Sequence, residues 1–284
     1  MKHPEKDDKC FTCPQRKNCE MASEKVAQQK ERIRENTRDI KGTIAVMSGK
    51  GGVGKSTFST LLALFLAQDP VKKVVLLDLD TTAPSVPAML GCPSGTKKGT
   101  LEPFHCTENL RVVSSGLFYG EDEAIAWTGT QKSGFIRAVL EATDFSGTDY
   151  LVVDTPPGTS EEHLTLAEVL GEIKAVLVTT PQSVSVCDVD RQIDFCRKAK
   201  MRVLGIVENM NMFHCPSCSR QSAIFSKNGG RLLAEKTRTR FIGSVPLNKE
   251  IARLCDEGVS EIAGGLSVFL PLLEKTRDCF LDTA

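Results

Sequence analysis

The chain has 284 residues, and its 36 basic and 36 acidic side chains give a formal net charge of zero at pH 7. Such a balance provides no overall field that would favour nucleic acid or an anionic membrane. No apolar run approaches the length needed to span a bilayer, and residues 1–8 lack the apolar core of a signal peptide. We therefore expect a soluble, intracellular protein with one large α/β domain and short appendages.

The cysteine content indicates thiolate ligands rather than a disulfide framework. The chain has 11 cysteines, an odd number, and an intracellular compartment keeps most thiols reduced. Six are isolated, mostly among apolar residues, and we expect them to act as small buried hydrophobes. These are Cys92, Cys106, Cys187, Cys196, Cys255 and Cys279. The others are clustered.

At the N-terminus, Cys10, Cys13 and Cys19 are spaced closely enough to bind a soft metal or an iron–sulfur cluster. Zinc would also need a fourth ligand, which these three cysteines do not supply. Residues 23–41 are rich in charged and glutamine side chains, which predicts a solvated helix or a linker. We therefore divide the chain into a cysteine-bearing extension at 1–41 and a main domain at 42–284.

A glycine-rich loop follows the first predicted strand. Residues 43–47 are β-branched and apolar, as in a buried strand, and residues 56–67 predict a helix. Between them lie Gly49, Lys50, Gly51, Gly52, Val53, Gly54, Lys55, Ser56 and Thr57. Strand, glycine turn and helix together are typical of a phosphate-binding loop, and a glycine turn without a ligand is the alternative.

The chemistry of this loop fits a nucleotide. Its glycines allow successive backbone N–H groups to turn toward a phosphate chain at a helix N-terminus, where the helix dipole favours negative charge. Lys55 can reach the β- and γ-phosphates, and Ser56 offers a hydroxyl to Mg²⁺. The sequence therefore predicts a site for ATP and Mg²⁺.

Two later strands are predicted to end in carboxylates at the same edge of the sheet. Residues 73–78 lead to Asp78 and Asp80, and residues 150–153 lead to Asp154. Ligands of open α/β sheets bind outside the carboxyl ends of the strands. We expect Asp80 to orient the attacking water or to support the metal, and Asp154 to lie on the Mg²⁺ side. Asp78 should point to the opposite side. Simple turn acids are the alternative for Asp78 and Asp80.

Residues 155–159 contain two prolines and a glycine, which predict a stiff turn near the γ-phosphate that can change shape when this phosphate leaves. His163 follows this turn. We expect it either at an interface or switch, or at the exposed start of a surface helix.

The remaining pattern completes a parallel α/β domain. Further strands are predicted at 111–115, 175–180, 203–207 and 241–246, and further helices at about 131–143, 185–199, 248–257 and 266–281. Asn209 follows a strand and carries a side-chain amide suited to an adenine edge. The loop that leaves the last strand at Pro246 is placed to cover the base.

Cys215 and Cys218 form a Cys-Pro-Ser-Cys motif between the last two predicted strands. Two thiolates are half of a tetrahedral zinc site or of a cubane iron–sulfur site. A two-fold axis would bring them together with their copies and so complete four ligands. A zinc ion shared by two chains, a thioredoxin-like redox pair and two idle cysteines are the alternatives.

These motifs resemble those of a known family. Lys50 is an additional lysine within the glycine-rich loop, directly after Gly49. It resembles the additional lysine in the deviant phosphate loop of the MinD, ParA, nitrogenase iron protein and Mrp-like ATPases. The other shared motifs are Asp78–Asp80, Pro84–Pro87, Asp154–His163, Glu208–Met210 and Cys215–Cys218. With the N-terminal cysteines, they resemble most the cytosolic iron–sulfur scaffold branch of the Mrp-like ATPases. This resemblance implies a three-layer, parallel-sheet P-loop NTPase of the SIMIBI class.

The resemblance also implies a function. It implies a slow ATP hydrolase in which Lys50, Lys55, Asp80 and Asp154 are catalytic and Lys50 reaches the partner subunit's nucleotide. A 4Fe–4S cluster would bridge two subunits at Cys215 and Cys218 and pass to cytosolic and nuclear apoproteins or to a targeting complex. The assembly would be a homodimer or a heterotetramer with a paralogous ATPase, located in the cytoplasm.

One feature departs from that branch, which has four N-terminal cysteines. Cys10, Cys13 and Cys19 match the last three, so the fourth ligand of a second iron–sulfur cluster stays open. His3, a carboxylate, an exogenous thiol or a residue missing from this start site are the candidates. A three-iron cluster or no cluster is the alternative.

The main competing functions are a MinD- or ParA-type positioning ATPase and a zinc-bridged dimer that binds nucleotide without turnover. A positioning ATPase needs an amphipathic membrane-binding tail or a basic DNA-binding face. Residues 266–284 carry few basic residues, and the net charge is zero. We therefore expect neither membrane nor nucleic acid as a partner.

Overall fold

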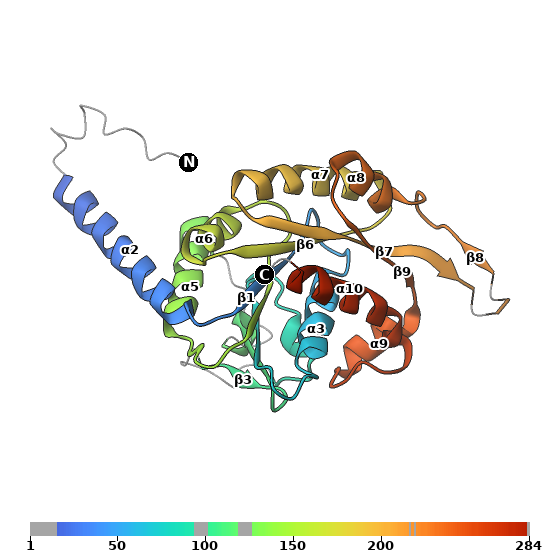
Figure 1. The fold of residues 1–284 in the computed structure, drawn as a ribbon, viewed down its shortest axis with the longest axis horizontal. Coiled ribbons are helices and arrows are strands. Elements are labelled where there is room, and N and C mark those ends of the chain that lie inside the picture. The colour runs from blue at the N-terminus through green and yellow to red at the C-terminus, as the bar shows by residue number, and fades with distance from the viewer. Residues whose placement is uncertain (1–15, 94–101, 119–126, 216, 219, 283–284) are drawn as a thin grey trace.

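A nine-stranded sheet forms the middle layer of the computed structural model (Figure 1), which describes residues 16–93, 102–118, 127–215, 217–218 and 220–282. The strands are β1 (Gly42–Ser48), β2 (Val74–Asp78), β3 (Phe104–His105), β4 (Leu110–Ser114), β5 (Tyr150–Asp154), β6 (Ile173–Thr179), β7 (Arg202–His214), β8 (Gln221–Ser222) and β9 (Phe241–Leu247). Their order is β3-β4-β2-β5-β1-β6-β7-β8, with β9 also paired to β7.

The helices of the described chain cover both faces of this sheet. They are α2 (Arg16–Thr37), α3 (Lys55–Leu66), α4 (Val86–Met89), α5 (Gly129–Ala142), α6 (Glu161–Val169), α7 (Ser183–Lys198), α8 (Gly229–Thr237), α9 (Lys249–Glu257) and α10 (Leu270–Leu281). Two short 3-10 helices lie at η1 (Ser115–Leu117) and η2 (Gly264–Phe269). The helices predicted from sequence are present, except that the last predicted helix is divided between η2 and α10.

Alternation along the buried strands builds the two cores. Ile44 and Val46 of β1 pack with α3 and α10, whereas Ala45 and Met47 face α5, α6 and α7. Successive side chains of a strand point to opposite faces, so one apolar strand supplies both cores. This confirms the three-layer α/β architecture.

The central strands are parallel, as predicted, but two edges of the sheet are not. β3 pairs antiparallel with β4, and β8 pairs antiparallel with β7. Both additions are two residues long, below the length at which a repeating pattern can be recognised in a sequence. No helix among the described residues is long and apolar enough to cross a membrane.

The second half of the N-terminal extension packs on the main domain. Ile33 of α2 is fully buried in the core that α5 and α6 share. The Asn36 side chain donates hydrogen bonds to the carbonyl oxygens of Leu140 at 2.9 Å and Thr143 at 2.7 Å. The first turns of α2 extend beyond the body of the protein (Figure 1). The predicted helix is therefore present, and from Ile33 onward it is not a free linker.

The register of the sheet gathers the functional loops at one edge. β1 lies between β5 and β6, and Val46 of β1 pairs with Asp154 of β5. Asp78 of β2 pairs with the same Asp154. The glycine loop after β1 and both strand-end carboxylates therefore meet at the carboxyl end of the sheet.

β7 and β9 pack closely at Gly205 of β7. A Cβ atom at Gly205 would lie 2.7 Å from both the Arg240 carbonyl oxygen and Ile242 Cγ1. Because a backbone atom cannot move aside cheaply, Gly205→Ala should destabilise the protein by about 1–3 kcal/mol. Gly134→Ala in α5 is the matched control, since no atom lies within 4 Å of its added Cβ. This control should be neutral or stabilising by about 1 kcal/mol. Urea unfolding midpoints measure both changes, and a Gly205→Ala midpoint equal to wild type would contradict the packing.

Candidate functional site

The loop between β1 and α3 has the backbone of an anion cradle. Gly52 has a φ of 77° and Gly54 a φ of 88°, both in the left-handed region that favours glycine. Gly54 is also the N-cap of α3, and its carbonyl oxygen accepts the Phe58 N–H at 3.0 Å. The predicted strand, glycine turn and helix are therefore in place. The N-terminus of α3 offers the unpaired backbone N–H groups and the positive dipole end that favour an anion.

A buried ion pair lies at the base of this cradle. Lys55 Nζ is 2.9 Å from Asp154 Oδ1, and the two side chains are 6% and 0% exposed. The Ser56 hydroxyl donates to Asp154 Oδ2 at 2.6 Å, and the Ser59 hydroxyl donates to Oδ1 at 2.7 Å. Lys55 was predicted to bind phosphate and Ser56 to bind Mg²⁺. Both contact Asp154, the carboxylate predicted on the Mg²⁺ side. Ser59 was not predicted, although its spacing of one helical turn from Ser56 was a signal for it.

Asp78 and Asp80 have different environments. Asp78 is buried and accepts hydrogen bonds from the Ser114 hydroxyl at 2.9 Å and the Asp80 N–H at 3.0 Å. Burial, followed by the neighbouring Asp154 charge, raises the pKa of Asp78 to about 8. The Asp80 carboxylate instead accepts the N–H groups of Thr82 and Ala83 at 3.3 Å. Asp80 lines the cavity beside the glycine loop, whereas Asp78 does not, and its role toward a water or the metal stays a prediction.

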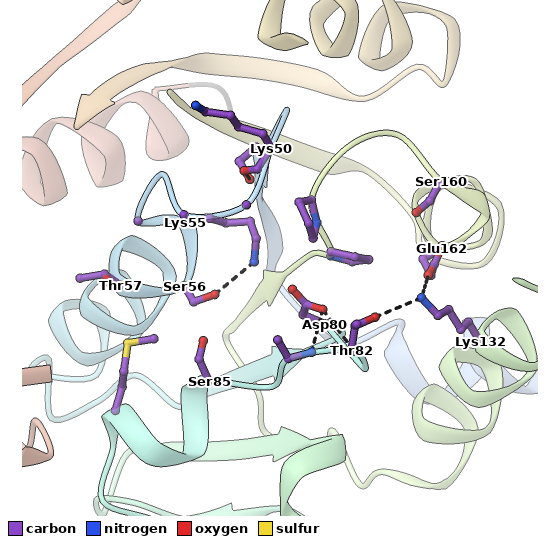
Figure 2. A pocket seen from close by; sticks show the side chains of 18 residues that line it. Lys50, Lys55, Ser56, Thr57, Asp80, Thr82, Ser85, Lys132, Ser160 and Glu162 are labelled. Carbon is purple, nitrogen blue, oxygen red and sulfur yellow. Dashed lines mark hydrogen bonds and ion pairs between the residues drawn. The ribbon is translucent and has the colours of Figure 1, made fainter. Parts of the chain in front are cut away.

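These residues surround a cavity of about 560 Å³. It is lined by Ser48, Lys50, Gly51, Gly52, Gly54, Lys55, Ser56, Thr57, Asp80, Thr82, Ala83, Ser85, Met89, Lys132, Pro156, Pro157, Ser160 and Glu162. Figure 2 shows the Lys55 amine directed into this cavity and the Lys50 amine directed away from it. The Lys50 amine donates a hydrogen bond to the side-chain oxygen of Gln182, in the segment before α7. The two lysine side chains of the loop therefore point in different directions.

Lys132 joins two segments across the cavity and was not predicted. Its amine lies 3.3 Å from Glu162 Oε1 and donates a hydrogen bond to the Thr82 hydroxyl at 3.4 Å (Figure 2). Burial alone would raise the pKa of Glu162, but the hydrogen bonds from Ser160, the backbone and Lys132 outweigh it and lower this pKa. Thr82 lies in the loop after β2, and Glu162 lies in the first turn of α6, so Lys132 connects this loop to the start of α6. No sequence pattern distinguishes this lysine from others on a helix.

A second cavity, of about 440 Å³, adjoins the first and shares Gly54, Thr57, Ser85 and Met89 with it. Asn209 and Pro246, the predicted base-binding residues, both line it. The Asn209 amide donates to the Val53 carbonyl oxygen at 2.9 Å, and its oxygen accepts the Met210 N–H at 2.9 Å. Asn209 therefore supports the glycine loop, and its pairing with a base stays a prediction.

The Cys-Pro-Ser-Cys motif lies at the tip of a hairpin. β7 ends at His214, β8 returns antiparallel to it, and the Cys215 N–H donates to the Arg220 carbonyl oxygen at 3.0 Å. The hairpin projects from the edge of the molecule (Figure 1). Cys218 is exposed, and Cys215 is partly exposed. Hydrogen bonds, chiefly from the Cys218 and Ser217 backbone, lower the pKa of Cys215 and so favour the thiolate that binds metals.

The side chains of the N-terminal cysteines are not among those that the structure describes. Cys10 and Cys13 lie outside the described residues, and Cys19 lies in α2 with its side chain outside them. In the described part of the chain, no three His, Cys, Asp or Glu side chains group closely enough to hold a metal ion. Cys215 and Cys218 are the described thiols of the hairpin, and their role as cluster ligands stays a prediction.

The expectation that His163 starts a helix at the surface is wrong. His163 does lie in the first turn of α6, but its side chain is fully buried. Its Nδ1 atom accepts the Ser160 N–H at 3.3 Å, while its Nε2 atom has no hydrogen-bond partner among the described residues. With this capping contact to Ser160, the ring lies inside the protein and packs edge-on to Phe195.

The titration of His163 predicts a pH dependence of stability. Burial lowers its pKa to about 4; the nearby Glu162 charge raises this pKa, and the Lys55 charge lowers it. Between pH 6.5 and 4 the unfolded chain binds a proton that the folded chain excludes, so stability falls as the pH falls. Asp78 has the opposite effect, because its raised pKa makes stability fall as the pH rises from about 4 to 8.

His163→Gln isolates the histidine, because glutamine can keep the hydrogen bond to the helix start without titrating. Between pH 6.5 and 5, wild type should lose about 2 kcal/mol more unfolding free energy than this variant. Denaturant unfolding of both proteins across this pH range measures the difference. Parallel pH profiles would contradict a buried, neutral His163.

The comparisons with known proteins agree with this geometry. The family model described as ParA, NUBPL iron-transfer P-loop NTPase, matches residues 39–267. A protein of Eremothecium gossypii named cytosolic Fe-S cluster assembly factor NBP35 is 42% identical, over 90% of this chain and 79% of its own. The protein of that name from Kluyveromyces lactis is 39% identical, over 98% of this chain and 89% of its own.

Solved structures show the same fold. A nucleotide-binding protein from Archaeoglobus fulgidus, in complex with ADP, superposes with a TM-score of 0.71 and 34% identity, over 84% of this chain and 95% of its own. The cell division ATPase MinD of Pyrococcus furiosus has a TM-score of 0.62 at 20% identity, over 84% of this chain and 99% of its own. This second likeness concerns the fold alone. From the family match, the two relatives and the site geometry together, the chain belongs to the NUBPL iron-transfer family of P-loop NTPases.

Proposed function

We propose that this protein is an ATP-dependent scaffold that assembles a 4Fe–4S cluster on Cys215 and Cys218 of two subunits and transfers it to apoproteins. The observation that carries this proposal is the path of β7. Asn209 in β7 holds the glycine loop through Val53, and Cys215 follows the last residue of the same strand. One strand therefore links the nucleotide site to the thiols.

The strand is irregular between these two points. Met210, directly after Asn209, has a φ of 56°, which is rare for a side chain other than glycine. The pairing of β7 with β9 also shifts register between Asn209 and Phe213. Such irregularities mark places where a strand changes direction and where strain is stored near functional sites. A change in the glycine loop would reach the hairpin through this bend.

The nucleotide site fits ATP with Mg²⁺. The left-handed backbone at Gly52 and Gly54 is the one that glycine adopts without strain, and it would let the loop N–H groups turn toward a phosphate chain. Lys55 and the loop N–H groups would bind the phosphates, Ser56 and Asp154 would hold Mg²⁺, and Mg²⁺ would neutralise developing charge. Asp80 would orient the attacking water, while Asn209 and Pro246 would contact the base. We propose slow ATP hydrolysis, coupled to transfer of the cluster.

The dimer supplies what one chain lacks. Lys50 bonds to Gln182 on the outer side of its own loop, which supports a role in the partner subunit's nucleotide site. The same two-fold axis would place two copies of Cys215 and Cys218 together, giving four thiolates. A homodimer and a heterotetramer with a paralogous ATPase both satisfy this requirement.

The relatives support the substrate and the location. Two of them carry the name cytosolic Fe-S cluster assembly factor at about 40% identity. We therefore propose a cytoplasmic protein that serves cytosolic and nuclear apoproteins, directly or through a targeting complex. Cys10, Cys13 and Cys19 are proposed to hold a second iron–sulfur cluster whose fourth ligand is open. A zinc ion bridging the same thiols is the second candidate for the hairpin, because zinc prefers the same ligands.

Metal and sulfide analysis separates these candidates. Anaerobic protein supplied with iron and sulfide should turn brown and carry close to equal amounts of iron and acid-labile sulfide. Cys215→Ser/Cys218→Ser should lose the share of both that belongs to the hairpin, because serine hydroxyls do not replace thiolate ligands. Cys187→Ser is the matched control, since Cys187 is exposed but isolated, and it should load as wild type does. Zinc without sulfide in the wild-type protein would favour the zinc-bridged dimer. Unchanged loading of the double variant would overturn the proposal.

Complementation between two inactive variants tests whether Lys50 acts in the partner subunit. Lys50→Ala and Lys55→Gln/Asp154→Asn should each lose ATP hydrolysis on the order of 100-fold, since each removes charge that stabilises the transition state. The second variant changes both residues because Lys55→Gln alone would leave the buried Asp154 charge unpaired. A mixed dimer retains one site with its own Lys55 and the partner's Lys50.

Mixing the two variants in equal amounts should therefore restore roughly a quarter of the wild-type rate, because half of the random dimers are mixed and each carries one complete site. Size-exclusion chromatography of the mixture confirms exchange of subunits. Mixed dimers that remain as inactive as their parents would show that Lys50 acts within its own chain.

A further inference from the structure

Two cysteines that are isolated in the sequence lie side by side in the fold. The sulfur atoms of Cys92 and Cys106 are 3.2 Å apart. Cys92 is 5% exposed within the core that α3 and α4 share, and Cys106 packs against this core while remaining partly exposed. Neither cysteine belongs to the nucleotide cavity or to the thiol hairpin. The expectation that both act as separate buried hydrophobes misses their contact.

Cys92 ends the segment that forms one wall of the nucleotide cavity. This segment runs from Asp80 through α4, and its cavity-lining residues are Asp80, Thr82, Ala83, Ser85 and Met89. The Cys92 N–H donates to the Pro87 carbonyl oxygen at 2.8 Å, so Cys92 is tied directly to α4. Any restraint on Cys92 is therefore a restraint on this wall.

Cys106 is anchored to the sheet. It begins the turn between β3 and β4, and its N–H donates to the Leu110 carbonyl oxygen at 3.0 Å. Leu110 begins β4 and pairs with Val74, whereas Ser114 at the other end of β4 pairs with Asp78 beside the nucleotide site. Cys106 therefore lies toward the end of the sheet remote from the nucleotide, on a fixed element.

We propose that Cys92 and Cys106 form a reversible disulfide that ties the cavity wall at residues 80–92 to the β3–β4 hairpin and slows nucleotide turnover. The effect on turnover rests on the ATPase activity proposed above, whereas formation of the disulfide does not. The oxidant is hydrogen peroxide. A protein that handles oxygen-sensitive iron–sulfur clusters would gain from an ATPase that stops when peroxide is present.

The chemistry needs only the two thiols and one peroxide. Either sulfur can donate the hydrogen bond between them. This contact lowers the pKa of Cys92, while the same contact and burial raise the pKa of Cys106, so we assign the thiolate to Cys92. The Cys92 thiolate attacks a peroxide oxygen, the O–O bond breaks, and a sulfenic acid and hydroxide form. The Cys106 sulfur then attacks the Cys92 sulfur, its proton leaves, the S–O bond breaks, and water departs. The sulfurs lose two electrons, and the peroxide is reduced to two waters.

The disulfide would act by limiting motion. Loops around a γ-phosphate change shape when it leaves. Here Lys132 also joins the wall to the first turn of α6, because it contacts both Thr82 and Glu162. A covalent bond at Cys92 holds one end of this wall to the sheet. The oxidised protein would keep the resting arrangement, so both hydrolysis and release of ADP would slow.

Peptide mapping tests the disulfide without any assay of ATP. Trypsin cuts at Lys97 and Lys98, between the two cysteines, so each cysteine falls on its own peptide, residues 74–97 and 99–111. The full-length anaerobic protein is titrated with hydrogen peroxide, its free thiols are blocked, and the digest is examined by mass spectrometry. The linked pair of peptides should accumulate at low peroxide and disappear on reduction with dithiothreitol.

Turnover is measured on the same samples. Wild type should lose ATP hydrolysis and release of a fluorescent ADP analogue several-fold on oxidation and recover both on reduction. Cys106→Ser should keep both rates under the same mild oxidation, and Cys187→Ser, which changes an isolated exposed thiol, should respond as wild type does. Failure of the linked peptides to form in wild type would overturn the disulfide. A linked wild type with unchanged ADP release would overturn the control of turnover. Absence of ATP hydrolysis in the reduced protein would instead count against the proposed function.

Discussion

The buried ion pair between Lys55 and Asp154 is the constraint around which the site is built. A lone charge at either position would be strongly destabilising, because both side chains are almost wholly removed from water. Ser56 and Ser59 also donate hydrogen bonds to this carboxylate, so both of its oxygens have partners before any ligand binds. In the function proposed above, nucleotide with Mg²⁺ would replace this pairing by phosphate for Lys55 and metal for Asp154. The ion pair is in place before any ligand binds, and occupancy of the site would change the contacts of α3, β5 and the loops beside them.

Three further contacts join elements around the nucleotide cavity. The Asn209 side chain in β7 is hydrogen-bonded to Val53 of the glycine loop, and β7 leads on to the thiol hairpin. Lys132 joins the loop after β2 to the first turn of α6. Cys92 and Cys106 connect the far end of the β2 loop to the edge of the sheet. Each connection joins elements that are distant in the sequence, and each offers a way for nucleotide, partner or oxidant to influence the others.

Much of the fold was predictable, because its signals are local. The apolar strands, the glycine loop and the helix that follows it are each specified by neighbouring residues, and the structure places them as expected. The residues that were missed depend on tertiary packing. His163 is polar and near a helix start, yet its ring is buried and packs against Phe195 of α7. Lys132 and the two paired cysteines acquire their neighbours only when α5, α4 and the β3–β4 hairpin assemble. The short strands β3 and β8 have too few residues to show a period.

The central claim is that the nucleotide site controls what the thiols at Cys215 and Cys218 hold. The most direct test is the rate at which an iron chelator removes iron from the cluster-loaded dimer, followed by loss of colour. The account predicts faster removal while ATP is being hydrolysed than with a non-hydrolysable analogue or with no nucleotide. Equal rates under all three conditions, in protein shown to hydrolyse ATP, would contradict it.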